Sequence, residues 1–237
     1  MPSDPLVAMR LASLFSGGKD STYATRLAAE GGDEVAYLVT MLPRRDDSWM
    51  FHTVNISFAP IIAGALGIEC VVRETGGEKE RELGDLRDVL GGLEVDGLVT
   101  GTIASTYQRS RVDGICDELG LRHVAPLWGR DGLELLWEML SARMVIVVTA
   151  VAARGLGQGW LGRVLDSEAV GELDNLSRRF GVNVCGEGGE METLVLDAPW
   201  FREKLEVLKA EPAWDGVRGS YIVEEARLVP KPRIHKG

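Results

Sequence analysis

The chain has 237 residues, enough to bury a complete hydrophobic core, and its 26 basic and 36 acidic residues give a net charge of −10. That balance argues against extensive nucleic-acid binding, because such binding depends on Lys and Arg side chains that neutralise phosphates. The three cysteines are far apart, no signal peptide is evident and no apolar run is long enough to span a membrane, so we expect a cytoplasmic protein without a disulfide framework, a Cys-x-x-Cys zinc site or a membrane partner.

The first informative stretch runs from Leu14 to Ser21. An apolar run precedes two adjacent glycines, and a segment with helical spacing follows them. This order predicts a strand, a tight turn and a helix, in which the N–H groups of the turn and of the first helical turn converge. The helix dipole favours an anion at that point, and Lys19 adds a positive charge beside the hydroxyls of Ser16 and Ser21. We therefore expect a phosphate-binding loop.

The type of loop follows from its spacing. A Walker loop would need glycine at Ser13 and Ser or Thr at Asp20, and no Gly-x-Gly-x-x-Gly pattern can be laid over the stretch. The pattern Ser-Gly-Gly-Lys-Asp-Ser instead resembles the loop of the ATP pyrophosphatases, which split ATP into AMP and pyrophosphate. The alternative is an incidental glycine turn that Asp20 caps.

Strands and helices alternate after this loop. We expect strands near 34–41, 69–73, 97–102, 123–127 and 144–151. We expect helices near 61–66, where Asn55 or Ser57 could be the cap, and near 78–90, 107–119 and 133–140. This alternation predicts an α/β fold, a parallel twisted sheet with helices on both faces. Because ligands of such sheets bind at the carboxyl ends of the strands, Ser16, Thr40 and Gly101 should share one nucleotide cleft.

The alternation breaks near residues 154–159. A helix near 168–180, a glycine turn at 186–189, a strand near 192–197 and extended segments near 204–209 and 221–228 follow. We read them as a smaller C-terminal α+β lobe that covers the cleft. The expected domains are therefore residues 1–153, which bind the nucleotide, and 154–237, which bind the second substrate.

Acidic residues surround the glycine turn from Gly186 to Thr193. If a strand begins at Glu190, then Glu190 and Glu192 point to one face. Such carboxylates could hold Mg²⁺, bind a cationic substrate or act as a general base. The alternative is a solvated acidic turn that leads into a strand.

The stretch from Ser105 to Arg111 follows the fourth expected strand. Its N–H groups and arginines could face the cleft and contact phosphate or carboxylate. The alternative is a capped helix with an ordinary pair between Arg109 and Asp113. His52 and His123 have no partner at metal-ligand spacing, so we expect hydrogen-bonded structural roles for them.

Several stretches together resemble the diphthine–ammonia ligase family. They are the loop at 16–21, Ser48-Trp49-Met50-Phe51-His52-Thr53, and the runs 101–112 and 186–193. The similarity extends from about Arg10 to about Phe201. The sequence departs from the family pattern at Val54, where proline is expected, and at Met191, where an aromatic residue is expected.

The resemblance implies an ATP-dependent, AMP-forming ligase that converts the diphthine carboxylate on translation elongation factor 2 to an amide, with ammonium as the nitrogen source and Mg²⁺ beside ATP. It implies catalytic roles for Lys19, Asp20, Glu187 and Glu190, with Asp20 also on the metal. The implied nucleotide-binding residues are Ser16, Gly17, Gly18, Lys19, Asp20, Ser21, Thr40 and Gly101. The implied substrate-binding residues are Ser48, His52, Ser105, Tyr107, Gln108, Arg109, Arg111, Glu187, Glu190 and Glu192.

Three other readings of the loop stay open at this point. They are a tRNA-modifying ATP pyrophosphatase, a small-molecule amide ligase, and a module that binds ATP or AMP without turning it over. The acidic, cysteine-poor composition disfavours the first, and the complete loop motif disfavours the third. The sequence leaves the oligomeric state open, a homo-oligomer included.

Overall fold

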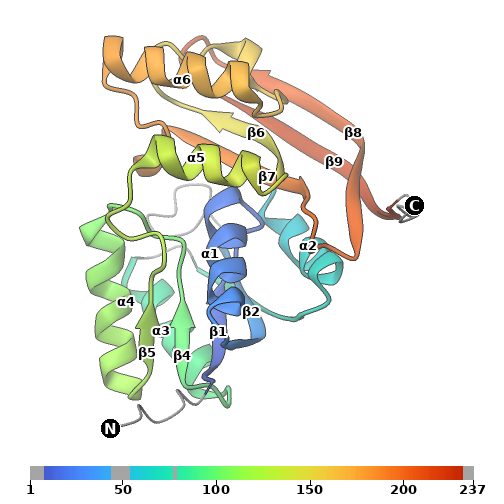
Figure 1. Ribbon diagram of the computed structural model, residues 1–237. Helices are drawn as coiled ribbons and strands as arrows, with labels where there is room; N and C mark the ends of the chain where they lie inside the picture. Colours follow the sequence, from blue (N-terminus) through green and yellow to red (C-terminus); the bar gives the residue numbers. More distant parts are fainter. Residues whose placement is uncertain (1–7, 44–53, 77–78, 232–237) are drawn as a thin grey trace, which may run out of the picture.

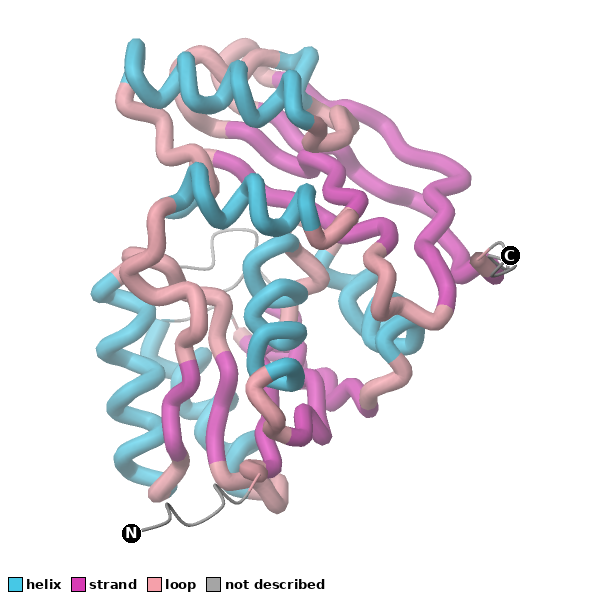
Figure 2. Tube along the Cα trace, in the orientation of Figure 1, coloured by secondary structure: helices cyan, strands magenta, loops and turns pink. Residues whose placement is uncertain are grey.

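Two sheets organise the computed structural model, which describes residues 8–43, 54–76 and 79–231 (Figures 1 and 2). The first sheet is parallel throughout, with the strand order β3-β2-β1-β4-β5. Its strands are β1 (Arg10–Leu14), β2 (Glu34–Pro43), β3 (Glu69–Thr75), β4 (Gly97–Val99) and β5 (Arg122–Val124). The second sheet is antiparallel, in the order β7-β6-β9-β8. Its strands are β6 (Val145–Val151), β7 (Met191–Asp197), β8 (Glu203–Trp214) and β9 (Gly219–Pro230).

Helices cover both faces of the parallel sheet, as predicted (Figure 1). Successive residues of a strand point to opposite faces, and the packing shows it: Leu11 of β1 belongs to one buried cluster and Ala12 to another. The first cluster includes residues of α1 (Lys19–Glu30), α2 (Ala59–Leu66) and α5 (Gly132–Ser141). The second includes residues of α3 (Lys79–Gly91) and α4 (Thr106–Leu119). Burial is deepest in the inner strands β1, β2 and β4, and these strands read as apolar runs in the sequence.

The second lobe is the predicted α+β unit. Helix α6 (Ser167–Phe180) lies over its sheet (Figure 1). Asp166 begins α6 by accepting a hydrogen bond from Ala169 N (2.8 Å), and Gly181 ends it with φ at +74°. Leu173 of α6 and Ile146 of β6 belong to the same buried cluster as Leu11 of β1, so one hydrophobic core joins the two lobes.

One expectation about the strands is wrong. The apolar run near 144–151 forms β6, but β6 pairs antiparallel with β7 and β9 and therefore lies in the second sheet. A fully apolar run indicates burial on both faces, and α6 and the shared core supply that burial here without a parallel sheet. The division into 1–153 and 154–237 stays a proposal, and the pairing of β6 favours an earlier boundary.

Asn55 does not cap α2, and Ser57 does not either. The residue at the N-cap of α2 is Phe58, and no side chain bonds there. Asn55 has φ at +60°, and its side chain donates to Tyr221 O (2.8 Å) and accepts from Val223 N (2.9 Å) on β9. A residue predicted to act locally therefore joins the first lobe to the second sheet.

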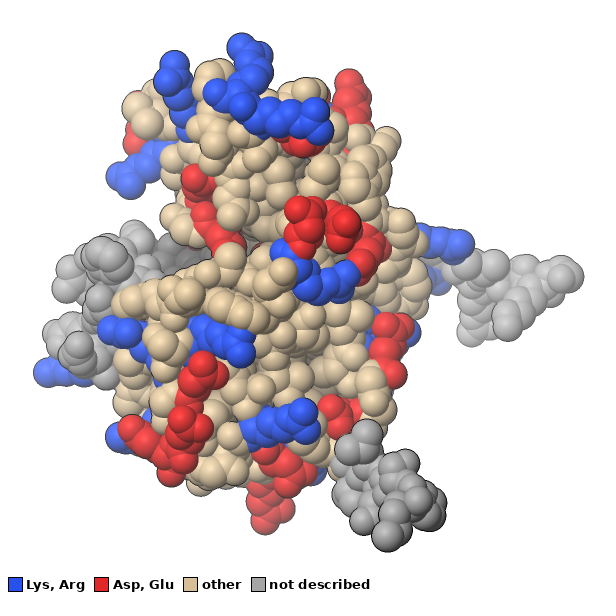
Figure 3. Space-filling view, turned by 60° about the vertical axis from the view of Figure 1, so that its left-hand side comes forward, with Lys and Arg blue, Asp and Glu red and all other residues tan. Residues whose placement is uncertain are grey.

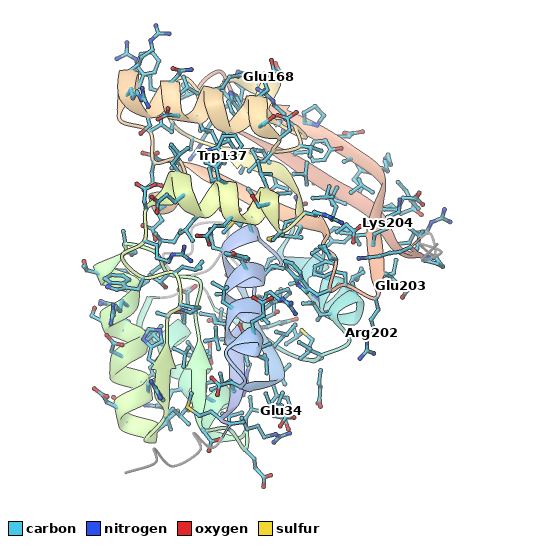
Figure 4. All side chains as sticks on the ribbon, in the orientation of Figure 1. Glu34, Trp137, Glu168, Arg202, Glu203 and Lys204 are labelled. Atoms are coloured by element: carbon cyan, nitrogen blue, oxygen red, sulfur yellow. The ribbon has the colours of Figure 1, made fainter. Side chains whose placement is uncertain are left out.

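Backbone contacts fix the second lobe against the first. Arg202, just before β8, donates its N–H to Ala65 O near the end of α2 (2.6 Å), and Figure 4 shows this junction from Arg202 to Lys204. A second contact joins Val195 N of β7 to Gly17 O in the glycine turn before α1 (2.9 Å). These contacts position the second sheet over the carboxyl ends of β1 and β4.

The charges of the surface are mixed on the face shown in Figure 3, with basic side chains gathered at the top of the second lobe and acidic ones spread over both lobes. No helix within the described ranges is both long and apolar enough to cross a membrane.

Candidate functional site

A cavity of about 570 Å³ lies where the carboxyl ends of β1 and β4 meet the second lobe. The first lobe contributes residues of the loop 16–21, Gly101 after β4, and Tyr107 and Gln108 at the start of α4. The second lobe contributes Glu187 and other residues between 185 and 193. The structure therefore brings together the two stretches that the sequence pattern singled out.

The phosphate loop, residues 16–21, has the predicted form. Gly17 has φ at +75°, which favours glycine, and a Cβ there would lie 2.8 Å from Ile62 Cδ1. Ser16 N donates to Ser21 Oγ (3.3 Å), and Gly18 N donates to Ser16 Oγ (3.3 Å). Gly18 is the N-cap of α1 and offers no side-chain cap. Serine hydroxyls thus hold the N–H groups of the turn, and the first turn of α1 keeps unpaired N–H groups beside the cavity.

The sequence predicts that Gly101 and Thr40 both contact the nucleotide, but only Gly101 lies at the cavity. A Cβ on Gly101 would lie 2.7 Å from both Asp20 C and Ser21 N, so only glycine lets the chain after β4 pass this close to the start of α1. Gly101 lines the cavity. Thr40 is fully buried, is not among the lining residues, and donates to Phe15 O (2.9 Å). We assign Thr40 to the support of β1 and do not propose it as a nucleotide contact.

Lys19 reaches across to the second lobe. Its ammonium donates to Asp20 Oδ2 (2.8 Å) and to Cys185 O (2.6 Å), and the side chain is 1% exposed. Burial lowers the pKa of Lys19, but Asp20 and the other negative groups nearby outweigh it, so the pKa is raised above its ordinary value. Lys19 therefore carries its positive charge inside the protein.

Asp20 has the chemistry of a magnesium ligand. Its Oδ2 binds Lys19, whereas its Oδ1 is buried with no hydrogen-bond partner among the described residues. Mg²⁺ prefers oxygen ligands and is commonly held by one or two carboxylates together with phosphates. A single carboxylate such as Asp20 therefore fits a cation that phosphate oxygens also hold. In the described part of the chain, no three or more His, Cys, Asp or Glu side chains are grouped so that they could hold a metal ion.

Glu187 joins the second-lobe turn to the first lobe. One carboxylate oxygen accepts from Ile103 N (2.9 Å) and Ala104 N (2.8 Å), and the other accepts from Ala104 N (3.0 Å). Gly186, Gly188 and Gly189 have φ between +76° and +80°, which lets the chain turn tightly around Glu187. The carboxylate lies at the cavity wall and is held by backbone donors from the chain between β4 and α4.

Glu190 and Glu192 do not share a strand face. Strand β7 begins at Met191, and Glu190 has helical dihedral angles (φ −69°, ψ −33°). The carboxylate of Glu190 accepts from Asn183 N (2.6 Å), and Glu190 is not among the residues that line the cavity, although Glu192 is. The expectation of one acidic face is wrong because the glycine turn continues through Glu190. We therefore assign Glu190 a supporting role and propose no catalytic one.

At the start of α4, only some of the expected substrate-binding residues line the cavity. Ser105 caps the helix by accepting from Gln108 N (3.3 Å), and Ser105, Tyr107 and Gln108 line the cavity. The two arginines do not line it. Arg109 stacks on the Trp128 ring (4.3 Å to the centroid) and pairs with Asp113 (3.7 Å), and Arg111 stacks on the Tyr107 ring (3.9 Å). The alternative reading, an ordinary pair between Arg109 and Asp113, is the observed one.

The remaining predictions divide as follows. Ser48 and His52 lie outside the described residues. His123 has the expected hydrogen-bonded role, between Asp113 Oδ1 (2.6 Å) and Thr100 Oγ1 (2.8 Å). Val54 and Met191, the two departures from the family pattern, both line the cavity.

Two contacts at this site were not foreseen from the sequence. Thr193 of β7 accepts a hydrogen bond from Lys19 N (3.2 Å), and the carbonyl of Cys185 holds the Lys19 ammonium. Thr193 ends the stretch 186–193, which the sequence analysis singled out, so it could have been named as a candidate. The sequence does not show that it would contact the start of α1. The Cys185 contact is made by the backbone and leaves no signal in residue type.

Comparison with known proteins gives consistent matches. The diphthamide synthase N-terminal domain family matches residues 9–123, and the diphthamide synthase C-terminal domain family matches residues 131–229. A diphthine–ammonia ligase from Bos taurus is 35% identical over 226 residues, covering 86% of this chain and 84% of the relative. One from Danio rerio is 36% identical over 219 residues, covering 83% of this chain and 86% of the relative.

A solved structure shows a weaker likeness. It is a predicted subunit of tRNA methyltransferase from Methanocaldococcus jannaschii, 17% identical, with a TM-score of 0.43, covering 81% of this chain and 98% of that one. A likeness of that size carries no inference about function.

Proposed function

Since the chain belongs to the diphthamide synthase family, we propose that it is a diphthine–ammonia ligase that converts the diphthine carboxylate on translation elongation factor 2 to the amide, with ATP and ammonium as co-substrates. The observation that carries this proposal is the single cavity in which the phosphate loop 16–21 meets the turn that bears Glu187. An ATP-dependent ligase needs such a meeting point, because the carboxylate must reach the α-phosphate. A cytoplasmic protein substrate gives the enzyme a cytoplasmic location.

The proposed reaction has two steps. A diphthine carboxylate oxygen attacks the α-phosphorus of ATP, and the bond from that phosphorus to the oxygen that bridges to the β-phosphate breaks. Pyrophosphate leaves, and an acyl-adenylate remains. Ammonia then attacks the acyl carbon, the bond to the AMP oxygen breaks, and the amide and AMP are formed. Ammonium must first lose a proton, because its protonated form has no lone pair for attack.

The phosphate loop would stabilise the first step. Negative charge builds on the pyrophosphate as it leaves, and donors already in place at that position lower the barrier without reorganising. The loop offers the hydroxyls of Ser16 and Ser21, and the first turn of α1 offers the N–H groups of Asp20 and Ser21. Lys19 adds a charge that burial in the wall keeps from water. Because this charge acts on the leaving group, its loss should lower turnover more than ATP affinity.

Asp20 would hold Mg²⁺ through its buried Oδ1 atom. When bound, the cation would neutralise part of the charge on the phosphates. Asp20 also binds Lys19, so one carboxylate positions both positive groups beside the phosphates.

The acidic side of the cavity would serve the second substrate. Diphthine carries a quaternary ammonium, which a carboxylate and an aromatic ring attract. Glu192 and Tyr107 line the cavity and supply these two groups. The Glu187 carboxylate accepts from the Ile103 and Ala104 N–H groups, so its role is to hold the turn and to add negative charge near the incoming ammonium. We assign the deprotonation of ammonium to this acidic wall.

The test is a reconstituted assay with ATP, Mg²⁺ and ammonium, with and without elongation factor 2 that carries diphthine. We expect AMP and pyrophosphate only when the factor is present, and an amide on the modified histidine by mass spectrometry. AMP formed with a small carboxylic acid in place of the factor would contradict the substrate assignment. ADP, or no product under any condition, would contradict the assignment of the phosphate loop. Glutamine that replaced ammonium at equal rate would contradict free ammonia as the nitrogen source.

A further inference from the structure

The free edge of the second sheet rests on the phosphate loop. β7 is an end strand in the order β7-β6-β9-β8, so one of its edges has no strand partner within the described residues. That edge meets the loop, because Val195 N donates to Gly17 O (2.9 Å). Two residues earlier on the same strand, Thr193 lies against Gly18. A Cβ atom built on Gly18 would be 3.1 Å from Thr193 O and 3.6 Å from Thr193 Oγ1. The register of β7 therefore sets the position of Thr193 beside the loop.

The Thr193 hydroxyl accepts one hydrogen bond and has its donor hydrogen to spare. Its oxygen accepts from Lys19 N (3.2 Å), an N–H group at the first position of α1. The hydroxyl hydrogen has no acceptor among the residues that the structure describes, and Thr193 lines the cavity. A threonine hydroxyl can accept and donate at the same time, so an acceptor in the cavity would complete its bonding.

We propose that Thr193 is a nucleotide-binding residue supplied by the second lobe, whose hydroxyl accepts from Lys19 N and donates its own hydrogen to a β- or γ-phosphate oxygen of ATP. This inference rests on the proposed use of ATP, but not on the identity of the acceptor. The phosphates then touch the second sheet directly, so the lobe that carries Glu187 and Glu192 also contributes to the nucleotide site.

The chemistry of the position suits phosphate. A charged oxygen is a stronger acceptor than a neutral one, and a hydroxyl already polarised by an N–H donor is a better donor in turn. Ser16 and Ser21 hold the loop in a similar way, since their hydroxyls also accept from loop N–H groups. Thr193 would be the matching hydroxyl on the opposite wall.

The experiment compares isothermal titration of Mg·ATP, Mg·pyrophosphate and AMP in the full chain and in Thr193→Val, which keeps the shape of the side chain and removes the hydroxyl. We expect the affinities for ATP and pyrophosphate to fall about tenfold, as for a hydrogen bond to a charged group, and the affinity for AMP to change by less than about twofold. Thr193→Ser should keep ATP affinity within about threefold.

Thr149→Val is the matched control. Thr149 lies on the neighbouring strand β6, is 1% exposed, and has a hydroxyl without a partner among the described residues. Loss of the Thr149 hydroxyl should leave the affinities for ATP, pyrophosphate and AMP unchanged.

Three results would overturn the proposal. Thr193→Val could bind pyrophosphate as tightly as the unaltered chain does, or its affinity for AMP could fall as much as its affinity for ATP. In the third, the affinity of Thr193→Ser for ATP would be as low as that of Thr193→Val. An unaltered chain that binds neither ATP nor pyrophosphate would overturn the proposed function as well. If Thr193→Val shows the expected affinities but the unaltered chain forms no amide on elongation factor 2, only the assignment of the second substrate fails.

Discussion

The phosphate loop 16–21 and the second-lobe turn 185–193 are both rich in glycine, and both line the same cavity, but they are held in different ways. In the loop, the bonds among Ser16, Gly18 and Ser21 span five residues at most. In the turn, Glu187 is fixed by N–H groups 83 and 84 residues away, whereas Glu190, three positions on, is fixed by Asn183. A local loop reveals its role in its own sequence. In the turn, Glu190 has a partner only seven positions away, whereas the role of Glu187 depends on partners from the other lobe.

The sharpest test of this comparison is Lys19→Met, because Lys19 is where the loop meets the turn. The variant removes the charge next to the pyrophosphate and the bond to Cys185 O. We expect turnover, measured as AMP release, to fall at least about 100-fold, with a smaller loss of ATP affinity.

Lys209→Met is its matched control, since Lys209 pairs with Glu224 on the surface and should change turnover by less than about twofold. If Lys19→Met kept turnover within threefold of the unaltered chain, Lys19 would only join the lobes.

A pair of glycines separates backbone strain from close packing in the turn. Gly186 and Gly188 have φ at +76° and +78°. A Cβ would lie 2.4 Å from Met191 O at Gly186, but would meet nothing within 4 Å at Gly188. Gly186→Ala should therefore lower the free energy of unfolding by about 3 kcal/mol, the sum of strain and overpacking, and Gly188→Ala by about 1 kcal/mol. Urea unfolding of both variants would measure this difference. Equal losses of the free energy of unfolding would mean that the turn relaxes around the new methyl group at Gly186.

The two glutamates give the next test. Glu187→Gln keeps an acceptor for Ile103 and Ala104 but loses the charge beside the proposed ammonium path, so we expect turnover to fall about tenfold with little change in melting temperature. Glu190→Gln, which lies off the cavity, should leave turnover within about twofold and lower the free energy of unfolding by about 1 kcal/mol. Equal losses of turnover in both variants would return Glu190 to the catalytic set.

The sequence predicted those features that depend on neighbours in the chain or on a repeating period. The glycine turn between β1 and α1 and the parallel sheet belong here, because Gly17 needs a backbone conformation that favours glycine and the apolar runs need burial. The placement of β6 failed, because an apolar run shows that a strand is buried but not which sheet it joins. Asn55 failed for a related reason: its side chain can cap a helix or bind a distant strand, and only the fold decides.

The site followed the same division. Residues of the loop and Gly101 line one cavity, as the sequence predicted, because strand ends converge at one edge of a parallel sheet. Their roles in binding stay predictions. Residues that depend on the meeting of the lobes were missed or misassigned. Thr193 meets Lys19 across 174 positions of the chain. Arg109 was misassigned within the first lobe, because its side chain lies over the Trp128 ring and not at the cavity.

The last test concerns Cys185, which begins the turn. Burial above all raises the pKa of its thiol from 9.0 to about 12. Below pH 9 the thiol is neutral in both the folded and unfolded chain, so stability does not depend on it. Between pH 9 and 12 only the unfolded chain loses the proton, so stability falls as pH rises, by about 1.4 kcal/mol per pH unit at most. Urea unfolding from pH 8 to 10.5 should show a steeper decline for the unaltered chain than for Cys185→Ser, which has no thiol to ionise. Equal slopes would mean that water reaches the thiol, and that the turn opens away from the phosphate loop.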